Sequence, residues 1–581
     1  MRLMDRPNVL ILMSDQHHPR LMGHAGEPAI RTPNLDRLAA AGVGFSQAYC
    51  PAPLCVPSRM AFLTGRFPSD IAVWTNRCVL GSHVPTFAHG LSLAGWRTTL
   101  CGRMHFTGPD QHHGFQRRLV GDVSGAADHL ATGLFEGVWS AAGCGQSYEG
   151  LLDDAVGPGQ ATYAAYDDAV TERACELLHA DARGDEGEAP FCTVVGMLLP
   201  HNPYVCPGDL FEEYMDRLAA PHALGELPGD EHPAVQALRR YRGVDRVGPE
   251  QARRARAAYF GMITLMDRNI GRVLDALEAT GLAERTAVLY TSDHGDLAGE
   301  HGLWWKDSFY EGSVGVPMIW SWPGRFRTGH RADAVVSLLD VAPTLIDLAG
   351  AEPLPGARGR SLLGLLKGEA AVDHWPSIAF AETCAEGQRP ARMVRSGRWK
   401  LNVYHGYDRP QLFDLVSDLE ERHDLGADAA FAEVRRDLLA RVADGWSGEW
   451  VERQVRRRVE DMRIVQRWKA TQPVGESERW AMRPGMNLWV FIAAFTPIPY
   501  KVFTIAAGVA AFGMESGPWT FFAGFLLASA LGRAGRFFLV SGLIYAFGEP
   551  VKRFIDKYFD WCALAFAVLL IGAFFLLKHL F

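Results

Sequence analysis

Short apolar runs alternate with helical patterns along the first 370 residues of the chain. Residues 7–15 form an apolar run that ends at Asp15, which is the pattern of a buried strand. Residues 32–42 then show helical periodicity, with a capping threonine at the start and a glycine at the end. Apolar runs that end in polar residues recur at 96–103, 191–200 and 286–296. This alternation predicts an α/β fold with a mostly parallel central sheet flanked by helices on both faces.

The pattern changes beyond residue 370, where short strand-like runs replace the alternation. Residues 391–404 and 409–415 look like short antiparallel strands, and a helical stretch follows at 431–443. Charged residues with helical spacing come next, and a strongly apolar, glycine-rich tail follows. The predicted organisation is an α/β domain (6–370), a small C-terminal α+β subdomain (371–450), a charged helical linker (451–483) and an all-helical membrane segment (484–581).

Composition narrows the class of protein. The chain has 581 residues, which is too long for one ordinary core and indicates more than one folded unit. Its formal net charge is -8, and it has no basic stripe with interleaved aromatic residues, so no nucleic-acid partner is expected. The ten cysteines are scattered without a Cys-x-x-Cys pair. This favours reduced thiols over a disulfide framework or a zinc site.

The predicted location rests on two apolar segments. The N-terminal run from Val9 to Met13 is shorter than a secretory apolar region of about 7–15 residues, so we expect the folded domains to be cytoplasmic. Three stretches of the tail reach the length of about 20 residues that spans a bilayer. They are Leu488–Phe512, Trp519–Phe547 and Trp561–Leu577. The sequence therefore predicts a multi-pass anchor in the lipid bilayer of the inner or plasma membrane.

Residues 55–66 carry the most specific motif of the chain. Cys55 and Arg59 stand in the pattern Cys-x-Pro-Ser-Arg at a predicted helix start, and Thr-Gly-Arg follows. This pattern resembles the signature of the sulfatase family, which belongs to the alkaline phosphatase superfamily and in which the cysteine is oxidised to formylglycine. The resemblance implies that a formylglycine-generating enzyme modifies Cys55, and that the modified residue attacks a small-molecule sulfate ester.

Hydrolysis of a sulfate monoester needs charge neutralisation, an activated oxygen nucleophile and protonation of the leaving group. In the hydrated aldehyde implied at position 55, one hydroxyl attacks sulfur, and the second later expels sulfate and restores the aldehyde. A divalent metal would lower the pKa of the hydroxyl and hold a sulfate oxygen. Arg59 lies one helical turn after Cys55 and is expected to hold the oxygen of the nucleophile near the helix N-terminus.

Two predicted strand ends offer oxygen ligands for such a metal. They carry Asp-Gln and Asp-His, whereas many sulfatases have Asp-Asp and Asp-Asn at the corresponding places. The resemblance is therefore closer to the subgroup of choline sulfatases and phosphonate monoester or phosphodiester hydrolases. It implies a site for Ca²⁺, with Mn²⁺ or Mg²⁺ as alternatives. The implied ligands are Asp15, Gln16, Cys55, Asp293 and His294.

Two further segments of the chain match the family near the carboxyl ends of predicted strands. Gly-Arg-Met-His resembles the Gly-Lys-x-His of sulfatases, which implies that Arg103 binds sulfate and that His105 contacts formylglycine. Arginine keeps the charge of the family's lysine but is longer and forked. Pro-His-Asn-Pro resembles Pro-His-x-Pro, which implies that His201 protonates the leaving oxygen or binds the anion.

The remaining candidates concern substrate binding. Lys306 ends a Gly-x-x-x-Lys match after the second metal pair and would bind sulfate. Asn76 stands where phosphonate hydrolases have an anion-binding asparagine, and Thr107 is a weaker match. Three tryptophans either stack on a cation such as choline or pack in the interior, and packing is favoured; they are Trp74, Trp304 and Trp305. The family resemblance covers roughly residues 6–450.

The apolar tail resembles the C-terminal half of the DedA, or SNARE-associated, membrane protein family. Prolines and a lysine interrupt its first stretch at Pro497–Lys501, and Arg533 and Arg536 share a face of the second. These features are typical of the re-entrant hairpins and buried arginines of that family. The resemblance implies either an anchor or a lipid-handling segment that acts with a partner copy in a homo-oligomer.

Three functions are compatible with these motifs. The favoured one is a membrane-tethered sulfatase. The first alternative is a phosphonate monoester or phosphodiester hydrolase with the same nucleophile. The second is a lipid-handling membrane protein whose sulfatase-like domain is inactive, and the intact set of polar residues argues against it.

Overall fold

The computed structural model describes residues 6–122, 146–152, 155–159, 162–218, 231–369, 374–385 and 388–471. The chain divides into two compact units, Met1–Asp461 and Met462–Phe581. The predicted membrane segment, its DedA-like features and the end of the linker, residues 472–483, lie outside the described residues. No helix within the described ranges is long and apolar enough to cross a membrane.

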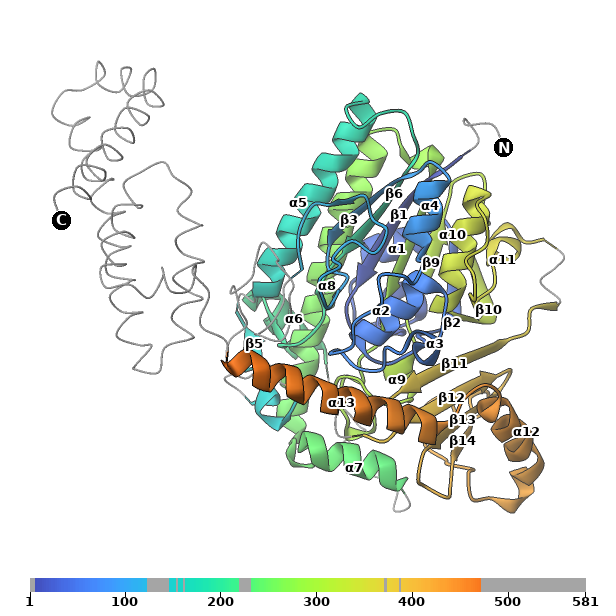
Figure 1. Ribbon diagram of the computed structural model, residues 1–581. Helices are drawn as coiled ribbons and strands as arrows, with labels where there is room; N and C mark the ends of the chain where they lie inside the picture. The colour runs from blue at the N-terminus through green and yellow to red at the C-terminus, as the bar shows by residue number, and fades with distance from the viewer. Residues whose placement is uncertain are drawn as a thin grey trace, which may run out of the picture. The chain divides into compact units, whose positions relative to one another are not determined.

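An eight-stranded sheet forms the centre of the first unit, with the order β10-β2-β9-β8-β1-β6-β3-β4. All neighbouring strands pair in parallel except β9, which runs antiparallel to β2 and β8. The predicted α/β fold with a mostly parallel sheet is therefore confirmed (Figure 1). The strands are β1 (Asn8–Ser14), β2 (Val43–Tyr49), β3 (Arg97–Gly102), β4 (Arg117–Arg118), β6 (Phe191–Gly196), β8 (Thr286–Ser292), β9 (Met318–Ser321) and β10 (His330–Ser337).

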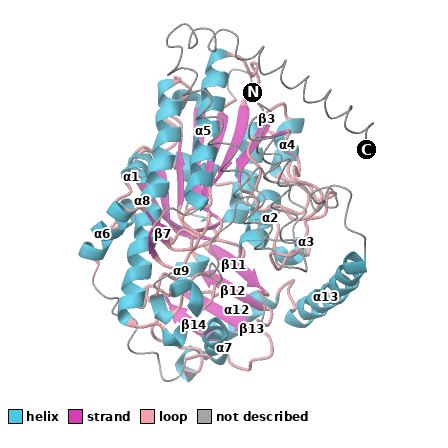
Figure 2. Cartoon of the chain, turned by 90° about the vertical axis from the view of Figure 1, so that its left-hand side faces the viewer, coloured by secondary structure: helices cyan, strands magenta, loops and turns pink. Residues whose placement is uncertain are grey.

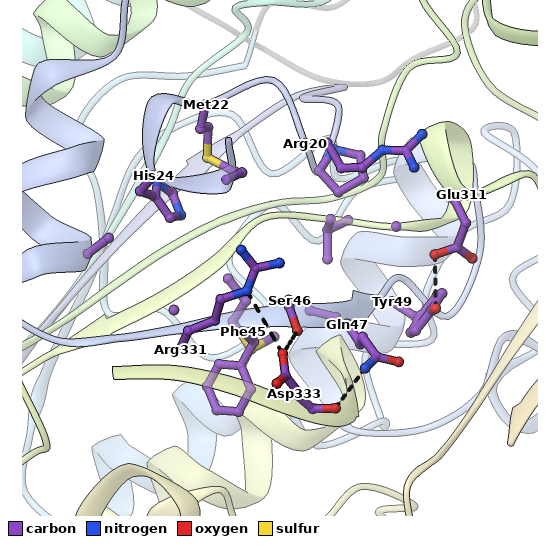
Figure 3. A pocket seen from close by; sticks show the side chains of 18 of the residues that line it. Arg20, Met22, His24, Phe45, Ser46, Gln47, Tyr49, Glu311, Arg331 and Asp333 are labelled. Carbon is purple, nitrogen blue, oxygen red and sulfur yellow. Dashed lines mark hydrogen bonds and ion pairs between the residues drawn. The ribbon is translucent and has the colours of Figure 1, made fainter. Parts of the chain in front are cut away.

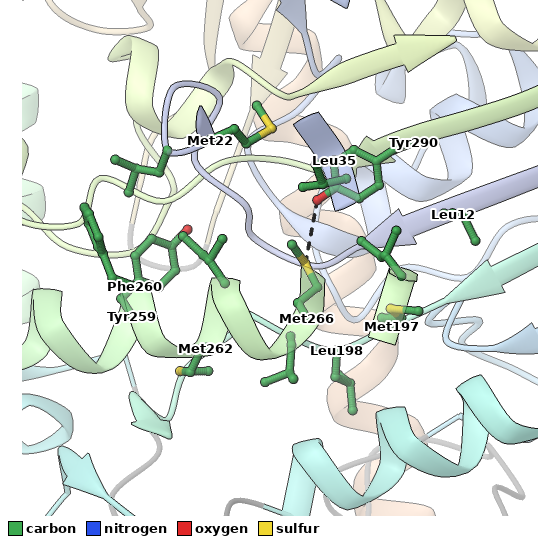
Figure 4. Close-up of a cluster of buried hydrophobic side chains, with 14 of the residues drawn as sticks. Leu12, Met22, Leu35, Met197, Leu198, Tyr259, Phe260, Met262, Met266 and Tyr290 are labelled. Atoms are coloured by element: carbon green, nitrogen blue, oxygen red, sulfur yellow. Dashed lines mark hydrogen bonds between the residues drawn. The ribbon is translucent and has the colours of Figure 1, made fainter. Parts of the chain in front are cut away.

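Strand β1 shows why the sheet is covered on both faces. Its successive side chains point to opposite faces, so Leu10 and Leu12 join one hydrophobic cluster while Val9, Ile11 and Met13 join another. The long helices α5 and α8 cover the first face, and α2, α4 and α10 cover the second (Figure 1). Figure 4 shows side chains of α8 in the first cluster, where the Tyr290 hydroxyl lies 3.6 Å from the sulfur of Met266.

The α/β part also contains a short two-stranded sheet and helices of widely different lengths. Its strands are β5 (Gly157–Pro158) and β7 (Val205–Cys206). The helices are α1 (Pro33–Ala40), α2 (Cys55–Thr64), α3 (Pro68–Ile71), α4 (Phe87–Leu93), α5 (Thr162–Arg183), α6 (Gly208–Arg217), α7 (Pro233–Arg242), α8 (Pro249–Ala279), α9 (Glu311–Val314), α10 (Val341–Ala349) and α11 (Leu363–Lys367).

A second, antiparallel sheet of four strands follows, as the sequence predicts, with the order β11-β12-β13-β14. It lies beyond the carboxyl ends of the central strands, with α12 packed on it (Figures 1 and 2). The backbone N–H of Glu382 donates to the carbonyl of Pro51, which ties this sheet to the segment just before α2. The elements are β11 (Ile378–Thr383), β12 (Ala391–Ser396), β13 (Trp399–Tyr404), β14 (Gln411–Asp414), α12 (Ala432–Ala443) and α13 (Gly448–Thr471).

Candidate active site

The carboxyl ends of four parallel strands deliver the predicted polar residues to one edge of the sheet. Asp15 follows β1, Arg103 follows β3, His201 comes a few residues after β6, and Asp293 follows β8. Parallel strands end at a common edge, and ligands of open α/β sheets bind there. Cys55 is the first residue of α2 and lies within this group. The structure thus brings together residues that lie as far apart in sequence as Asp15 and Asp293.

Four of the predicted metal ligands converge. One atom each from Asp15, Cys55, Asp293 and His294 lies within 4.8 Å of the others, and all four residues are buried. The Cys55 sulfur is 3.3 Å from Nε2 of His294 and 3.7 Å from a carboxylate oxygen of Asp15. Carboxylate, imidazole and thiolate groups are all common ligands of divalent metal ions. The donor set therefore fits a divalent cation.

Gln16 supplies an independent test of that fit. Its Nε2 donates to Oδ2 of Asp296 at 2.7 Å, and the Tyr204 hydroxyl donates to the same oxygen at 2.7 Å. Asp296 therefore fixes which end of the Gln16 amide faces it. The other end, Oε1, is buried and accepts no hydrogen bond from the described residues. A buried acceptor without a partner is costly, and a metal ion would satisfy it.

Arg59 contacts carboxylates instead of the residue that precedes it by one turn. Its Nε donates to Asp293 at 2.8 Å, and its Nη2 donates to Asp15 at 3.1 Å. Both ion pairs are fully buried. Burial lowers the pKa of the Arg59 guanidinium, but Asp293 and Asp15 raise it above its usual value. The arginine expected to hold the nucleophile therefore holds the two carboxylates of the metal group.

Arg103 uses its three nitrogen donors on three different partners. Nε donates to Asp15 at 2.6 Å, Nη1 to Asp122 at 3.3 Å, and Nη2 to Nδ1 of His105 at 2.8 Å. Asp122 also accepts the backbone N–H groups of Met104 and His105. Sequence reasoning missed Asp122, because a single aspartate after a two-residue strand has no pattern of its own. It is 2% exposed and anchors the whole Arg103–His105 turn.

Lys306 links Cys55 to His201. Its ammonium donates to the Cys55 sulfur at 3.0 Å and to Nε2 of His201 at 3.1 Å. Nδ1 of His201 lies 2.6 Å from the carbonyl of Asn202, which can only accept, so Nδ1 carries the proton of the neutral ring. Nε2 is then the acceptor that faces Lys306. Lys306 is thus the proton donor of this pair, and both side chains stand beside residue 55.

The surroundings of Cys55 favour an anion. Burial raises the pKa of the thiol, but Lys306, His294 and a hydrogen bond from His105 lower it to well below its usual value. The pKa of Asp15 is likewise low, because Arg103, His201 and Arg59 outweigh the opposite effects of burial and Cys55. Position 55 therefore lies in a positive potential inside a buried site, where charge interactions are strong.

Asp167 is another residue that sequence reasoning missed. It lies on α5 and accepts the backbone N–H groups of Leu198 and Leu199, at 2.7 and 2.9 Å. These two residues precede the Pro200–His201 turn, so Asp167 helps to fix that turn. Burial raises the pKa of its carboxyl to about 8, although the two N–H donors oppose this. A helical aspartate 34 positions before His201 gives no sequence pattern that could reveal the contact.

The weaker candidates have mainly structural contacts. Oδ1 of Asn76 accepts the backbone N–H of Val56 at 3.0 Å, and the Thr107 hydroxyl donates to the carbonyl of Cys78. The interpretation of the three tryptophans as packing residues agrees with their burial. Their exposed fractions are 3%, 2% and 0% for Trp74, Trp304 and Trp305.

A cavity of about 650 Å³ lies elsewhere, along β2 and β10. Figure 3 shows it between Arg20 and His24 on one side and Arg331 and Asp333 on the other, with Tyr49 at one end. None of the predicted site residues lines it. The predicted site residues therefore lie in the buried cluster around Cys55 and not in this cavity.

Comparison with known proteins identifies the family. The sulfatase family model matches residues 7–351, and the model for the C-terminal region of N-sulphoglucosamine sulphohydrolase matches residues 299–446. Choline-sulfatase of Rhizobium meliloti (strain 1021) is 35% identical over 458 residues, covering 75% of this chain and 86% of that protein. Arylsulfatase K of Danio rerio is 28% identical over 462 residues, with 75% and 82% covered.

The fold agrees with this assignment. The crystal structure of phosphonate monoester hydrolase of Agrobacterium radiobacter aligns with a TM-score of 0.62 at 23% identity, covering 76% of this chain and 95% of that one. A divalent metal is typical of sulfatases, and the buried group of Asp15, Cys55, Asp293 and His294 is able to hold one. The chain belongs to the sulfatase family and is a sulfuric ester hydrolase.

Proposed function

We propose that this protein hydrolyses sulfate monoesters at a formylglycine formed from Cys55, and that choline sulfate is its first candidate substrate. The single observation that carries the proposal is the position of Cys55. Its sulfur lies against His294 and Lys306 at the N-terminus of α2, within the buried group that fits a metal. The similarity to choline-sulfatase supports the choice of substrate.

Asp15, Gln16, Asp293 and His294 would hold the divalent cation, with residue 55 as the fifth ligand. Such an ion would supply positive charge to the sulfate oxygens and lower the pKa of a hydroxyl bound to it. Oxygen donors dominate this set, which favours Ca²⁺ and is compatible with Mg²⁺, and the one imidazole also allows Mn²⁺.

The protein's own groups then have distinct tasks. Lys306 holds the sulfate anion beside residue 55, and Arg103 keeps His105 and Asp15 in place while adding positive charge. When the bond between sulfur and the ester oxygen breaks, that oxygen gains negative charge and takes a proton. His201 and Lys306 share a hydrogen bond at 3.1 Å, so this pair delivers the proton to the leaving alcohol.

A phosphonate monoester or phosphodiester hydrolase is the second candidate function. The fold of the Agrobacterium enzyme supports it, because the same layout of strands and helices serves a phosphonate ester in that protein. Formylglycine at position 55 serves equally for attack on phosphorus. The third candidate, a lipid-handling protein with an inactive domain, would leave Cys55 unmodified.

A substrate panel on the modified enzyme tests the proposal. Choline sulfate, an aryl sulfate and an aryl phosphonate monoester are compared by kcat/KM, with Cys55→Ala as the blank. The proposal expects the sulfates to be the better substrates. A higher kcat/KM for the phosphonate would establish the second candidate function, and no turnover of any of the three esters would refute the proposal.

The tail and the location form a separate proposal. We infer from sequence that residues 484–581 tether the enzyme to a membrane with its catalytic domain in the cytoplasm. The matched family models extend only to residue 446 and therefore do not cover this segment. Cell fractionation of the full chain and of a chain ending at Pro484 tests it. The full chain is expected in the membrane fraction and the shortened chain, still active, in the soluble one; equal distribution would refute the tether.

A further inference from the structure

Helix α13 packs on the loop that carries Asn76. The rings of Trp450 and Trp74 meet edge to face, with centroids 5.7 Å apart and planes at 72°. Val451, which is 1% exposed, joins Trp74 and Cys384 in one small hydrophobic cluster. These contacts all lie within the first compact unit.

Packing alone holds the ring of Trp74 in place, while the backbone of its loop also accepts a hydrogen bond from Arg458 of α13 at the carbonyl of Ala72. Its indole Nε1–H is buried and donates to none of the described residues, so no hydrogen bond fixes the ring. The ring is 3% exposed, and Trp450 and Val451 form the wall that α13 provides. Removal of that wall would leave a void, and the ring would shift towards it because its other contacts are non-directional.

The loop in turn holds the N-terminus of the helix that begins with Cys55. The N-cap residue of α2 is Leu54, whose side chain has no acceptor, and no side-chain bond caps this end locally. Oδ1 of Asn76 instead accepts the backbone N–H of Val56 at 3.0 Å, one of the amide groups that a helix start leaves without a partner. The position of residue 55 therefore depends on Asn76.

Helix α13 also lies outside the matched family models. It begins at Gly448, and the C-terminal model ends at residue 446. The models account for the catalytic residues but not for this helix. Its contact with the Asn76 loop is consequently a property of this chain that the family assignment leaves unexplained.

We propose that α13 positions the nucleophile: Trp450 and Val451 hold Trp74, the loop then holds Asn76 over the start of α2, and residue 55 stays aligned with Lys306. The inference rests on the proposed role of residue 55 as the nucleophile. Trp74, Trp450 and Val451 are positioning residues, since they act on the reacting group through Asn76.

A matched pair of substitutions in the full-length chain tests this positioning. Val451→Ala removes the same two methyl groups as Val459→Ala, but Val459 is 45% exposed on the same helix. Displacement of a reacting group by a fraction of an ångström lowers the rate, so Val451→Ala should lower kcat about tenfold while KM changes little. The kcat of Val459→Ala should stay within about twofold of the wild-type value. Val451→Ile keeps a branched apolar side chain at this position and should retain activity. Equal activity of the two alanine variants would overturn the inference.

A double-mutant cycle separates positioning from general damage. Asn76→Ala should lower kcat, and Val451→Ala should have no further effect in that background, because both changes act through the same contact. Additive losses, or full activity of Asn76→Ala, would refute the inference. Cys55→Ala tests the proposed function independently. If that variant keeps activity, residue 55 is not the nucleophile and the proposed function is refuted. If it loses activity but the losses in the cycle are additive, only the positioning role of α13 is refuted.

Discussion

Replacement of Arg103 by lysine tests the geometry of the site most directly. The corresponding residue of the sulfatase pattern is lysine, so from the sequence alone Arg103→Lys would be expected to preserve activity. In the structure the guanidinium fork bonds Asp15, Asp122 and His105 through three separate nitrogens. A lysine ammonium is a compact charge on a shorter side chain and cannot reach all three. We therefore expect loss of function instead of a gain.

The size of the loss follows from the contacts. Asp15 is 0% exposed and Asp122 is 2% exposed, so a carboxylate left without its partner stays buried. A hydrogen bond to a charged group contributes about 1.5–3 kcal/mol, and lysine keeps the charge but loses at least one such bond. We expect a free energy of unfolding lower by about 2–3 kcal/mol and, through misplacement of His105 and Asp15, a kcat/KM lower by about 100-fold.

Three variants make the test decisive, with denaturant unfolding and turnover of an aryl sulfate as the measurements. Arg103→Lys with Asp122→Asn should recover part of the loss, because the unpaired carboxylate is gone. Arg272→Lys is the control: this arginine is 48% exposed and bonds Asp168 at 2.9 Å, so its substitution should cost at most about 1 kcal/mol. Wild-type activity and stability in Arg103→Lys would refute the importance of the fork.

The remaining predictions concern the nucleophile, the anion site and pH. Cys55→Ala should abolish turnover without lowering the unfolding midpoint, and peptide mass spectrometry of the wild-type chain should find residue 55 about 18 Da lighter than cysteine; an unmodified residue in active enzyme would contradict this. Lys306→Met should lower kcat/KM about a thousandfold, since a charge near 4 Å at an effective dielectric constant near 20 contributes about 4 kcal/mol; a loss below tenfold would show that Lys306 does not hold the anion. Burial lowers the pKa of His301 from 6.5 to about 4, so the unfolded chain binds more protons in that window and stability falls as pH drops from 6.5 to 4. His301→Asn, which suits the φ of 54°, should flatten this fall in urea unfolding, and an unchanged pH profile would show that His301 is not its source.

The sequence was sufficient to locate the site because its key residues stand next to strong local patterns. Asp15 and Asp293 directly follow buried apolar strands, and Cys55 opens a short motif with fixed spacing. Parallel strands bring such ends together wherever they lie in the chain. The buried α/β sheet was predictable for the same reason, since β1, β6 and β8 each contain a buried, mostly apolar run.

The supporting residues could not be predicted in this way. Asp122 and Asp167 each accept hydrogen bonds from a turn of the site and come from separate places in the sequence, whereas Asp296 stands three residues after Asp293 and binds the side chain of Gln16. A single aspartate after a short strand or inside a helix has no periodicity to mark it. Their roles depend on tertiary contacts, which local patterns do not encode. Arg59 is a similar case. The sequence shows that it lies one helical turn after Cys55, but not that it pairs with the two carboxylates of the metal group.

The charges of the site explain why the nucleophile is easier to assign than the preference for sulfur. Arg59 and Arg103 are bound to Asp15, Asp122 and Asp293, so most of their charge is already balanced. The positive charges of Lys306 and a divalent cation would then be balanced by the negatively charged nucleophile and by one negative charge on the substrate. Sulfate monoesters, phosphonate monoesters and phosphodiesters are all monoanions, whereas a phosphate monoester carries up to two charges and would leave a buried excess. The electrostatics therefore select monoanions, and the choice between sulfur and phosphorus must come from the groups that contact the alcohol side of the ester.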